Sequence, residues 1–167
     1  MIWDGGFEMD PVKGLNLFNW VIRPDKFALV AIDRSLARTG ERSLRMAFSG
    51  LDTTIIRDQV QQTIILKPGA RYFLECYAKA KDLVTPEGPR IAVIGQGGLL
   101  SQSDPVRTDS DDWQKLTISF VAPANQRLNQ QANQAPATLA IVRTPKFSYD
   151  DPTTGIIWFD DFSLVER

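Results

Sequence analysis

The chain has 167 residues, of which 43% are hydrophobic, which is enough for one domain with a sizeable core and too much for a disordered chain. Its 19 basic and 20 acidic side chains leave a net charge of −1, so no broad electrostatic attraction to nucleic acid or to an anionic membrane is expected. No apolar run approaches the roughly 20 residues that a membrane-spanning helix needs, and membrane insertion is therefore not expected.

Two residue types narrow the chemistry further. The chain has no histidine, which excludes Ser-His-Asp and Cys-His catalysis and HExxH zinc sites. Cys76 is the only cysteine, so no internal disulfide can form, and its apolar surroundings predict a buried thiol rather than a nucleophile. The N-terminus lacks the features of a signal peptide. Met1 directly before a strand-like segment suggests a mature protein or a module excised from a larger one.

Taken in order, the chain predicts short strands separated by turns. Residues 43–48 alternate apolar and polar side chains, as a half-buried strand does. Lys67-Pro68-Gly69 is a strong turn signal between two such segments. The expected strands are residues 3–8, 27–32, 43–48, 60–66, 72–79, 90–94, 113–121, 138–142 and 156–164, while residues 16–21 contain Phe18 and Trp20 with little clean alternation.

Two polar stretches interrupt this series. Residues 95–112 form a long stretch without an expected strand, and residues 124–137 are dominated by Asn and Gln, which is typical of a loop. No helical periodicity is visible. About ten short strands with turns between them predict an all-β sandwich or barrel that comprises residues 1–167 as one domain.

The segment 72–79 has two different faces. Tyr72, Leu74, Cys76 and Ala78 share the face expected to enter the core. Phe73, Glu75, Tyr77 and Lys79 share the other. A polar face that keeps aromatic rings is what a binding surface on a sheet requires.

The last segment contains adjacent carboxylates, Asp160 and Asp161, inside an apolar run. A carboxylate close to a core needs a cation, hydrogen-bond donors or water. Glu8 follows a short apolar segment at the other end of the chain. We therefore expect the two termini to be neighbours, with a hard metal ion between these carboxylates.

Several motifs in succession resemble the jelly-roll carbohydrate-binding modules of the galactose-binding-domain-like superfamily. They are Gly6-Phe7-Glu8, Gly40-Glu41-Arg42-Ser43-Leu44, Gln62 with the stretch from Lys67 to Tyr72, Trp113, and the stretch from Trp158 to Leu164.

The resemblance implies a jelly-roll β-sandwich of two antiparallel sheets with a structural calcium ion. It implies that Glu8, the backbone around Arg42 and Ser43, and Asp160 or Asp161 hold the calcium, because calcium takes oxygen ligands. The alternative is that these carboxylates bond to arginines or backbone donors without a metal. The fold itself hosts many functions.

An enzyme would need a catalytic group of residues, and we find none. A glycosidase uses two carboxylates about 5–9.5 Å apart across the sugar, whereas neighbours on a strand, such as Asp160 and Asp161, should point to opposite faces unless a β-bulge intervenes. The pairs 111–112 and 150–151 lie in polar loops, where solvated charge is the better explanation.

A carbohydrate-binding module needs an aromatic platform with polar side chains beside it. Tyr77 with Glu75 and Lys79 fits, and Trp20 and Arg90 are expected to add to the site. Alternatively, Trp20 plugs the core and Tyr77 is a satisfied surface aromatic. The other function left open is a protein-binding or structural accessory domain of an envelope or secreted protein. Either function predicts an extracytoplasmic location, with a poly- or oligosaccharide or a protein as partner.

Overall fold

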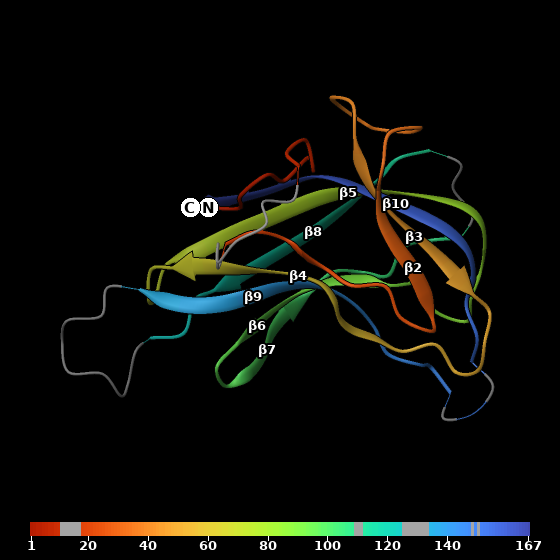
Figure 1. The fold of residues 1–167 in the computed structure, drawn as a ribbon. Helices are drawn as coiled ribbons and strands as arrows, with labels where there is room; N and C mark the ends of the chain where they lie inside the picture. The colour runs from red at the N-terminus through yellow and green to blue at the C-terminus, as the bar shows by residue number, and fades with distance from the viewer. Residues whose placement is uncertain (11–17, 109–111, 125–133, 148, 150) are drawn as a thin grey trace.

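The computed structural model is a sandwich of two antiparallel five-stranded sheets (Figure 1). It describes residues 1–10, 18–108, 112–124, 134–147, 149 and 151–167. Within these ranges no helix is long and apolar enough to cross a membrane. The predicted all-β jelly-roll sandwich is confirmed.

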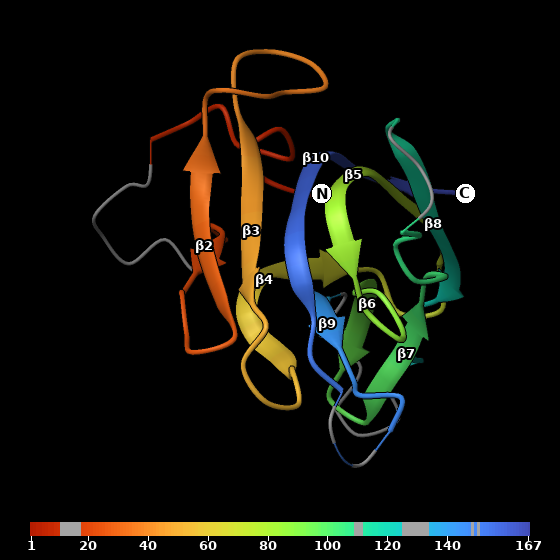
Figure 2. The same cartoon turned by 90° about the vertical axis from the view of Figure 1, so that its right-hand side faces the viewer.

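The two sheets have the following strands. Sheet A has the order β1 (Val21–Ile22), β4 (Ile56–Leu66), β9 (Ala135–Arg143), β6 (Arg90–Gly95) and β7 (Gly98–Gln102). Sheet B has the order β2 (Ala28–Asp33), β3 (Ser43–Ser49), β10 (Thr154–Glu166), β5 (Arg71–Val84) and β8 (Gln114–Val121). In Figure 2 the strands β2, β3, β10 and β5 run side by side, and the strands of sheet A lie against one face of this layer.

The core lies between the sheets and follows the alternation of the strands. Tyr72, Leu74, Cys76 and Ala78 of β5 are all buried, which confirms the face predicted to enter the core. Complete burial raises the pKa of the Cys76 thiol well above its ordinary value. Cys76 is therefore an unreactive core side chain, as expected.

The N-terminal segment 3–8 is not the strand that its sequence predicts. It forms a turn in which the Phe7 amide donates to the Asp4 carbonyl at 3.1 Å, and both residues have positive φ angles, 58° and 49°. The amide of Phe162 in β10 donates to the Gly5 carbonyl at 2.9 Å. A Cβ at Gly5 would lie 2.0 Å from the Phe162 carbonyl oxygen, so only glycine fits there. The two termini are neighbours, as predicted.

Two further expectations differ from the structure. The polar stretch 95–112 contains a strand after all, because β7 pairs with β6 around Gly98, whose φ of 111° permits the tight turn. Strand β9 begins at Ala135 and so takes in the end of the Asn/Gln-rich stretch. The rest of that stretch, residues 125–133, lies outside the described residues, as do Asp111 and Asp150.

Asp151 corrects the expectation of a solvated loop. Its side chain is fully buried and forms an ion pair with the equally buried Arg143 at the end of β9. Arg143 also donates to the carbonyls of Thr54 at 2.5 Å and Glu87 at 3.1 Å. This network joins β9 to the loops at one end of the sandwich.

Candidate functional site

The five predicted sugar-binding residues do not form one site. Glu75, Tyr77 and Lys79 lie together on the outer face of sheet B, as predicted from the alternation of β5. Arg90 lies in β6 of sheet A, where it pairs with Glu87 and donates to the Ser103 carbonyl at 2.7 Å. Because the two sheets present opposite outer faces, Arg90 does not extend the surface that carries Tyr77.

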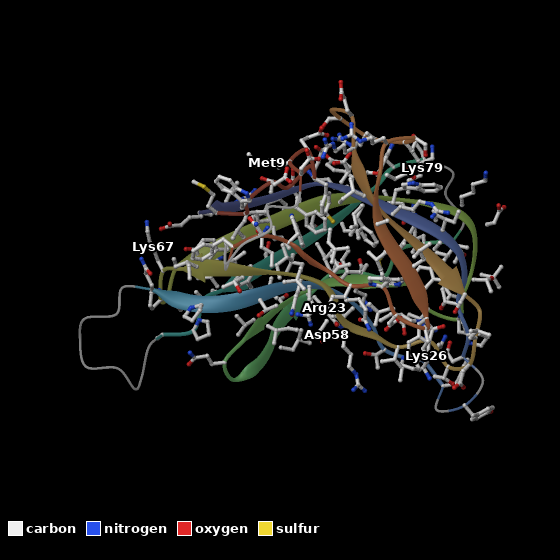
Figure 3. The ribbon with its side chains drawn as sticks, in the orientation of Figure 1. Met9, Arg23, Lys26, Asp58, Lys67 and Lys79 are labelled. Carbon is white, nitrogen blue, oxygen red and sulfur yellow. The ribbon has the colours of Figure 1, made fainter. Side chains whose placement is uncertain are left out.

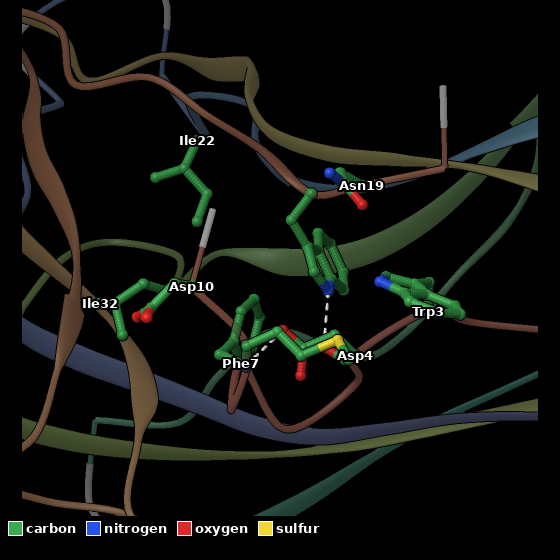
Figure 4. A pocket seen from close by; sticks show the side chains of 9 residues that line it. Trp3, Asp4, Phe7, Asp10, Asn19, Ile22 and Ile32 are labelled. Carbon is green, nitrogen blue, oxygen red and sulfur yellow. Dashed lines mark hydrogen bonds between the residues drawn. The ribbon is translucent and has the colours of Figure 1, made fainter. Parts of the chain in front are cut away.

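Trp20 lies apart from both faces, next to the N-terminal turn. Its ring packs against Phe7 and Phe162, with centroids 5.0 and 4.9 Å apart, and its indole N–H donates to the Asp4 carbonyl at 3.0 Å. These contacts agree with the alternative that Trp20 plugs the core. The ring nevertheless also lines a cavity of about 300 Å³ together with Trp3 (Figure 4).

The outer face of sheet B carries an aromatic residue that sequence reasoning missed. Trp158 of β10 pairs with Arg45 of β3 on one side and with Lys79 of β5 on the other. Its side chain therefore lies on the outer side of the sheet, opposite its core neighbours Ile157 and Phe159, but it is only 7% exposed. The same alternation, applied to the last strand of the sequence, would have placed Trp158 on this face.

Neighbouring side chains hold Trp158 in position. Its indole N–H donates to Asp33 at 2.7 Å, and the guanidinium of Arg45 lies 3.9 Å from the same carboxylate oxygen. Burial raises the pKa of Asp33, but the hydrogen bonds from Trp158 and Ser35 outweigh this effect and keep the pKa below its ordinary value. Lys79 extends from the same row (Figure 3). The row Arg45–Trp158–Lys79 thus combines an aromatic ring with charged groups that can bond to a ligand.

Cations lie over the other two aromatic rings of this face. The Arg38 guanidinium lies 3.4 Å from the centre of the Tyr77 ring, and Arg167 lies 4.4 Å from that of Phe73. Glu75 forms an ion pair with Lys115 at 2.6 Å. The predicted platform therefore faces outward, but its Tyr77 ring is covered by a side chain that a ligand would have to displace.

The carboxylates predicted to hold a metal gather around one loop, residues 38–42. Asp160 accepts from the Arg38 amide at 2.8 Å, and Asp161 accepts from the Arg38 guanidinium at 2.7 Å. Glu8 accepts from the amides of Glu41 and Arg42 at 3.0 and 3.1 Å. A Cβ at Gly40 would lie 2.2 Å from a Glu8 carboxylate oxygen, so this approach also requires glycine.

Asp160 is fully buried in this cluster. Burial raises its pKa from 3.8 to about 6, although the amides of Arg38 and Asp161 favour the charged form. The Arg38 pKa is raised, chiefly by its hydrogen bond to Asp161. A positive charge near Asp160 would be electrostatically favourable.

The chemistry of these groups fits calcium, which takes oxygen ligands. The Ser43 hydroxyl donates to the Leu36 carbonyl at 2.6 Å instead of facing the carboxylates, so Ser43 could contribute only its backbone carbonyl to an ion. As placed, no three acidic, histidine or cysteine side chains of the described residues are close enough to hold one ion. Binding would require Arg38 to leave Asp161.

The outer face of sheet A offers a weaker site. Ala92 and Ala140 face outward there, yet both are buried, because taller side chains on neighbouring strands surround them. The depression next to Ala92 has a volume of about 340 Å³ and is lined by Ile94, Leu99 and Val142 among others. None of its described lining residues is aromatic. This face therefore lacks a stacking platform for a sugar ring.

Comparison with solved structures shows that the fold is shared with carbohydrate-binding modules. The CBM22-2 xylan-binding domain of Paenibacillus barcinonensis Xyn10C is 12% identical, with a TM-score of 0.57 and full coverage of both chains. The CBM22-1–GH10 modules of Clostridium thermocellum Xyn10B, complexed with xylohexaose, are 14% identical with a TM-score of 0.57, and the match covers 99% of this chain and 28% of that one.

The same fold also occurs in an enzyme. An apo-form cyclase from Fischerella sp. is 15% identical, with a TM-score of 0.63 and coverage of 100% of this chain and 95% of the other. Neither the protein-family models nor the curated proteins compared with this sequence gave a match. The comparisons therefore establish the jelly-roll fold, and the function must be argued from the site.

Proposed function

We propose that this protein is a non-catalytic carbohydrate-binding module that holds a glycan against the outer face of sheet B. The observation that carries the proposal is the outward-facing set Glu75, Tyr77 and Lys79 on β5, which Arg45 and the largely buried Trp158 border on the same face. A sugar ring has apolar C–H surface that can pack on an indole or phenol ring, and hydroxyls that can bond to flanking charged groups.

The geometry suggests how the glycan would bind. The Arg38 side chain would leave the Tyr77 ring, and a sugar would take its place, while Lys79 and Glu75 would bond to hydroxyls. Water competes for those hydroxyls, so we expect micromolar to millimolar affinity, or about 4–8 kcal/mol. Two of the similar structures are named for xylan or xylohexaose, which makes xylan the first polysaccharide to test.

A non-catalytic role is supported by the residues present. The chain has no histidine, and the adjacent carboxylates Asp160 and Asp161 are engaged by the Arg38 loop. The proposal also places the protein outside the cytoplasm, in the periplasm, on the cell surface or in the medium, because that is where structural polysaccharides occur. We infer in addition a structural calcium ion, held by Glu8, Asp160 and Asp161 with backbone oxygens near Arg42 and Ser43, which would join the two termini.

The test is a glycan array, xylan included, followed by calorimetry with the best ligand. Tyr77→Ala should weaken binding about tenfold or more, equivalent to at least about 1.4 kcal/mol. Its melting temperature should change little, because the ring lies outside the core. Tyr149→Ala is the matched control, since Tyr149 is 75% exposed and lies in no strand of either sheet.

Trp158→Phe tests whether Trp158, which the sequence analysis did not assign to the site, contributes to glycan binding. This variant keeps an apolar ring but loses the hydrogen bond to Asp33, and it should weaken binding as well. Unchanged binding by both variants would refute the proposed face. If no glycan binds the wild type while a protein partner does, the protein-binding alternative replaces the proposal.

A further inference from the structure

The cavity beside the N-terminal turn is separate from the proposed glycan face. It has a volume of about 300 Å³, and its wall includes Trp3, Met9 and Trp20 (Figure 4). Trp3 and Met9 are 46% and 52% exposed, so two large apolar side chains stand half in water at the same cavity. Large apolar groups that are gathered and exposed are typical of a ligand contact rather than of a core.

The backbone around the cavity is held independently of these exposed side chains. The buried amide of Gln62 accepts from the Trp3 N–H at 3.0 Å and donates to the Trp3 carbonyl at 2.7 Å. The carboxylate of Asp4 accepts from the amides of Glu8 and Met9 at 2.8 and 3.1 Å. The cavity is therefore formed before any ligand arrives.

The turn beneath the cavity also stores strain. Asp4 and Phe7 adopt positive φ angles, which are unfavourable for residues other than glycine and persist only where surrounding contacts enforce them. The Phe7 conformation is enforced by the tilted contact of its ring with Trp20 and by its edge contact with Phe162. Strain of this kind occurs often at ligand sites, where it fixes the geometry in advance.

The polar groups of the cavity restrict the chemistry of a ligand. The carboxylates of Asp4 and Asp10, although already bonded within the protein, keep free lone pairs, and Asn19 contributes an amide, so the cavity suits a ligand with hydrogen-bond donors. The Asp10 charge is already balanced, because Arg42 donates to it at 2.7 Å and Arg34 lies 3.9 Å away. A ligand therefore needs no positive charge to balance that of Asp10.

A pyranose ring combines these properties, since it has apolar C–H faces for indole rings and hydroxyl donors for carboxylates. Ligand pockets usually measure about 300–1,000 Å³, and this cavity lies at the lower end, which suits one ring rather than a chain. We propose that the cavity between Trp3 and Trp20 is a second carbohydrate site, which holds a terminal pyranose ring of a neutral glycan. This extends the proposed function, since it rests on the protein being a glycan binder, but it uses different residues.

The experiment is NMR titration of the ¹⁵N-labelled protein with neutral methyl glycosides of xylose, glucose, galactose and mannose. At least one should shift the indole N–H signals of Trp3 and Trp20, with a dissociation constant of millimolar order. Trp3→Ala should weaken this binding about tenfold, and the Gln62 bonds to the backbone keep the segment in place. Phe147→Ala is the matched control, because Phe147 is 47% exposed and lies elsewhere.

Each outcome decides between the two sites. If Trp3→Ala abolishes glycoside binding while polysaccharide binding stays, both sites exist. If polysaccharide binds but no glycoside shifts the Trp3 and Trp20 signals, the cavity site is refuted and the proposed function stands. If glycosides bind in the cavity and no polysaccharide binds, the outer face of sheet B is refuted. A cavity that responds only to benzyltrimethylammonium, added as a separate probe, would also overturn the sugar assignment.

Discussion

The guanidinium of Arg38 lies 3.4 Å from the centre of the Tyr77 ring and also donates to Asp161 at 2.7 Å. One side chain therefore connects the carboxylate cluster of the two termini to the proposed glycan face. A change that moves the Arg38 side chain away from Tyr77 therefore also affects its hydrogen bond to Asp161, and the reverse holds as well.

The first prediction concerns the glycan affinity of an Arg38 variant. Arg38→Ala uncovers Tyr77, and an exposed cation–π contact contributes about 0.5–1 kcal/mol, so glycan affinity should rise about two- to fivefold. Calorimetry with the best polysaccharide measures the change, and Arg23→Ala, which removes an exposed arginine paired with Asp58, is the control. Weaker binding would mean that Arg38 itself contacts the sugar.

The second prediction concerns calcium. An ion that binds only the native state at 100 times its dissociation constant adds about 2.7 kcal/mol to the free energy of unfolding. Melting temperatures in excess Ca²⁺ and in EDTA should thus differ by several degrees, and Glu8→Gln should reduce the difference. Identical melting curves would contradict the calcium site. The hydrogen bonds from the 38–42 loop would then be sufficient to hold the three carboxylates together without a metal.

The third prediction concerns the buried ion pair. Asp151→Ala leaves the Arg143 guanidinium buried without a counter-charge and should lower the free energy of unfolding by about 3–5 kcal/mol. Urea denaturation measures this loss. Lys67→Ala removes an exposed ion pair with Glu166 and should leave the free energy nearly unchanged. Equal effects of the two changes would contradict the network described around Arg143.

The fourth prediction concerns pH. The pKa of Asp160 is about 6 in the native state against an ordinary value of 3.8, so the native state binds more protons between these values. The contribution of Asp160 to stability is therefore fully present below about pH 4 and is lost as the pH rises through about 6.

Urea denaturation in EDTA, compared between the wild type and Asp160→Asn, isolates this contribution from other titrating groups. The difference in free energy of unfolding, wild type minus variant, should decrease from about pH 4 to pH 7 and then level off. A difference that does not change with pH would show that the pKa of Asp160 is not raised.

Periodicity in the sequence was sufficient for most of the fold. The alternation of residues 72–79 correctly assigned Cys76 to the core and Tyr77 to the outer face, because a strand in a sandwich has one buried side. The strand predicted at residues 3–8 was wrong. There Gly5 and Gly6 permit a turn, and contacts with Phe162 decide between the two conformations.

The site was harder to predict, because it depends on which strands become neighbours. Arg90 and Tyr77 both lie on strands with a polar face, but the chain places β6 and β5 in different sheets. Nothing local indicates that Arg38, in a loop, covers Tyr77 from 39 positions away in the sequence. Asp151 is a similar case, since only the fold brings Arg143 to it.

The position of β10 in sheet B has a consequence for the synthesis of this protein. The last strand of the chain is the central strand of its sheet, and it alone connects the β2–β3 pair with the β5–β8 pair (Figure 2). Until β10 has formed, the edges of β3 and β5 that face it lack their partner and expose backbone groups that other chains can pair with. Sheet B should therefore be completed only after β10 has been synthesised, and a chain truncated before Thr154 should aggregate rather than form a smaller sandwich.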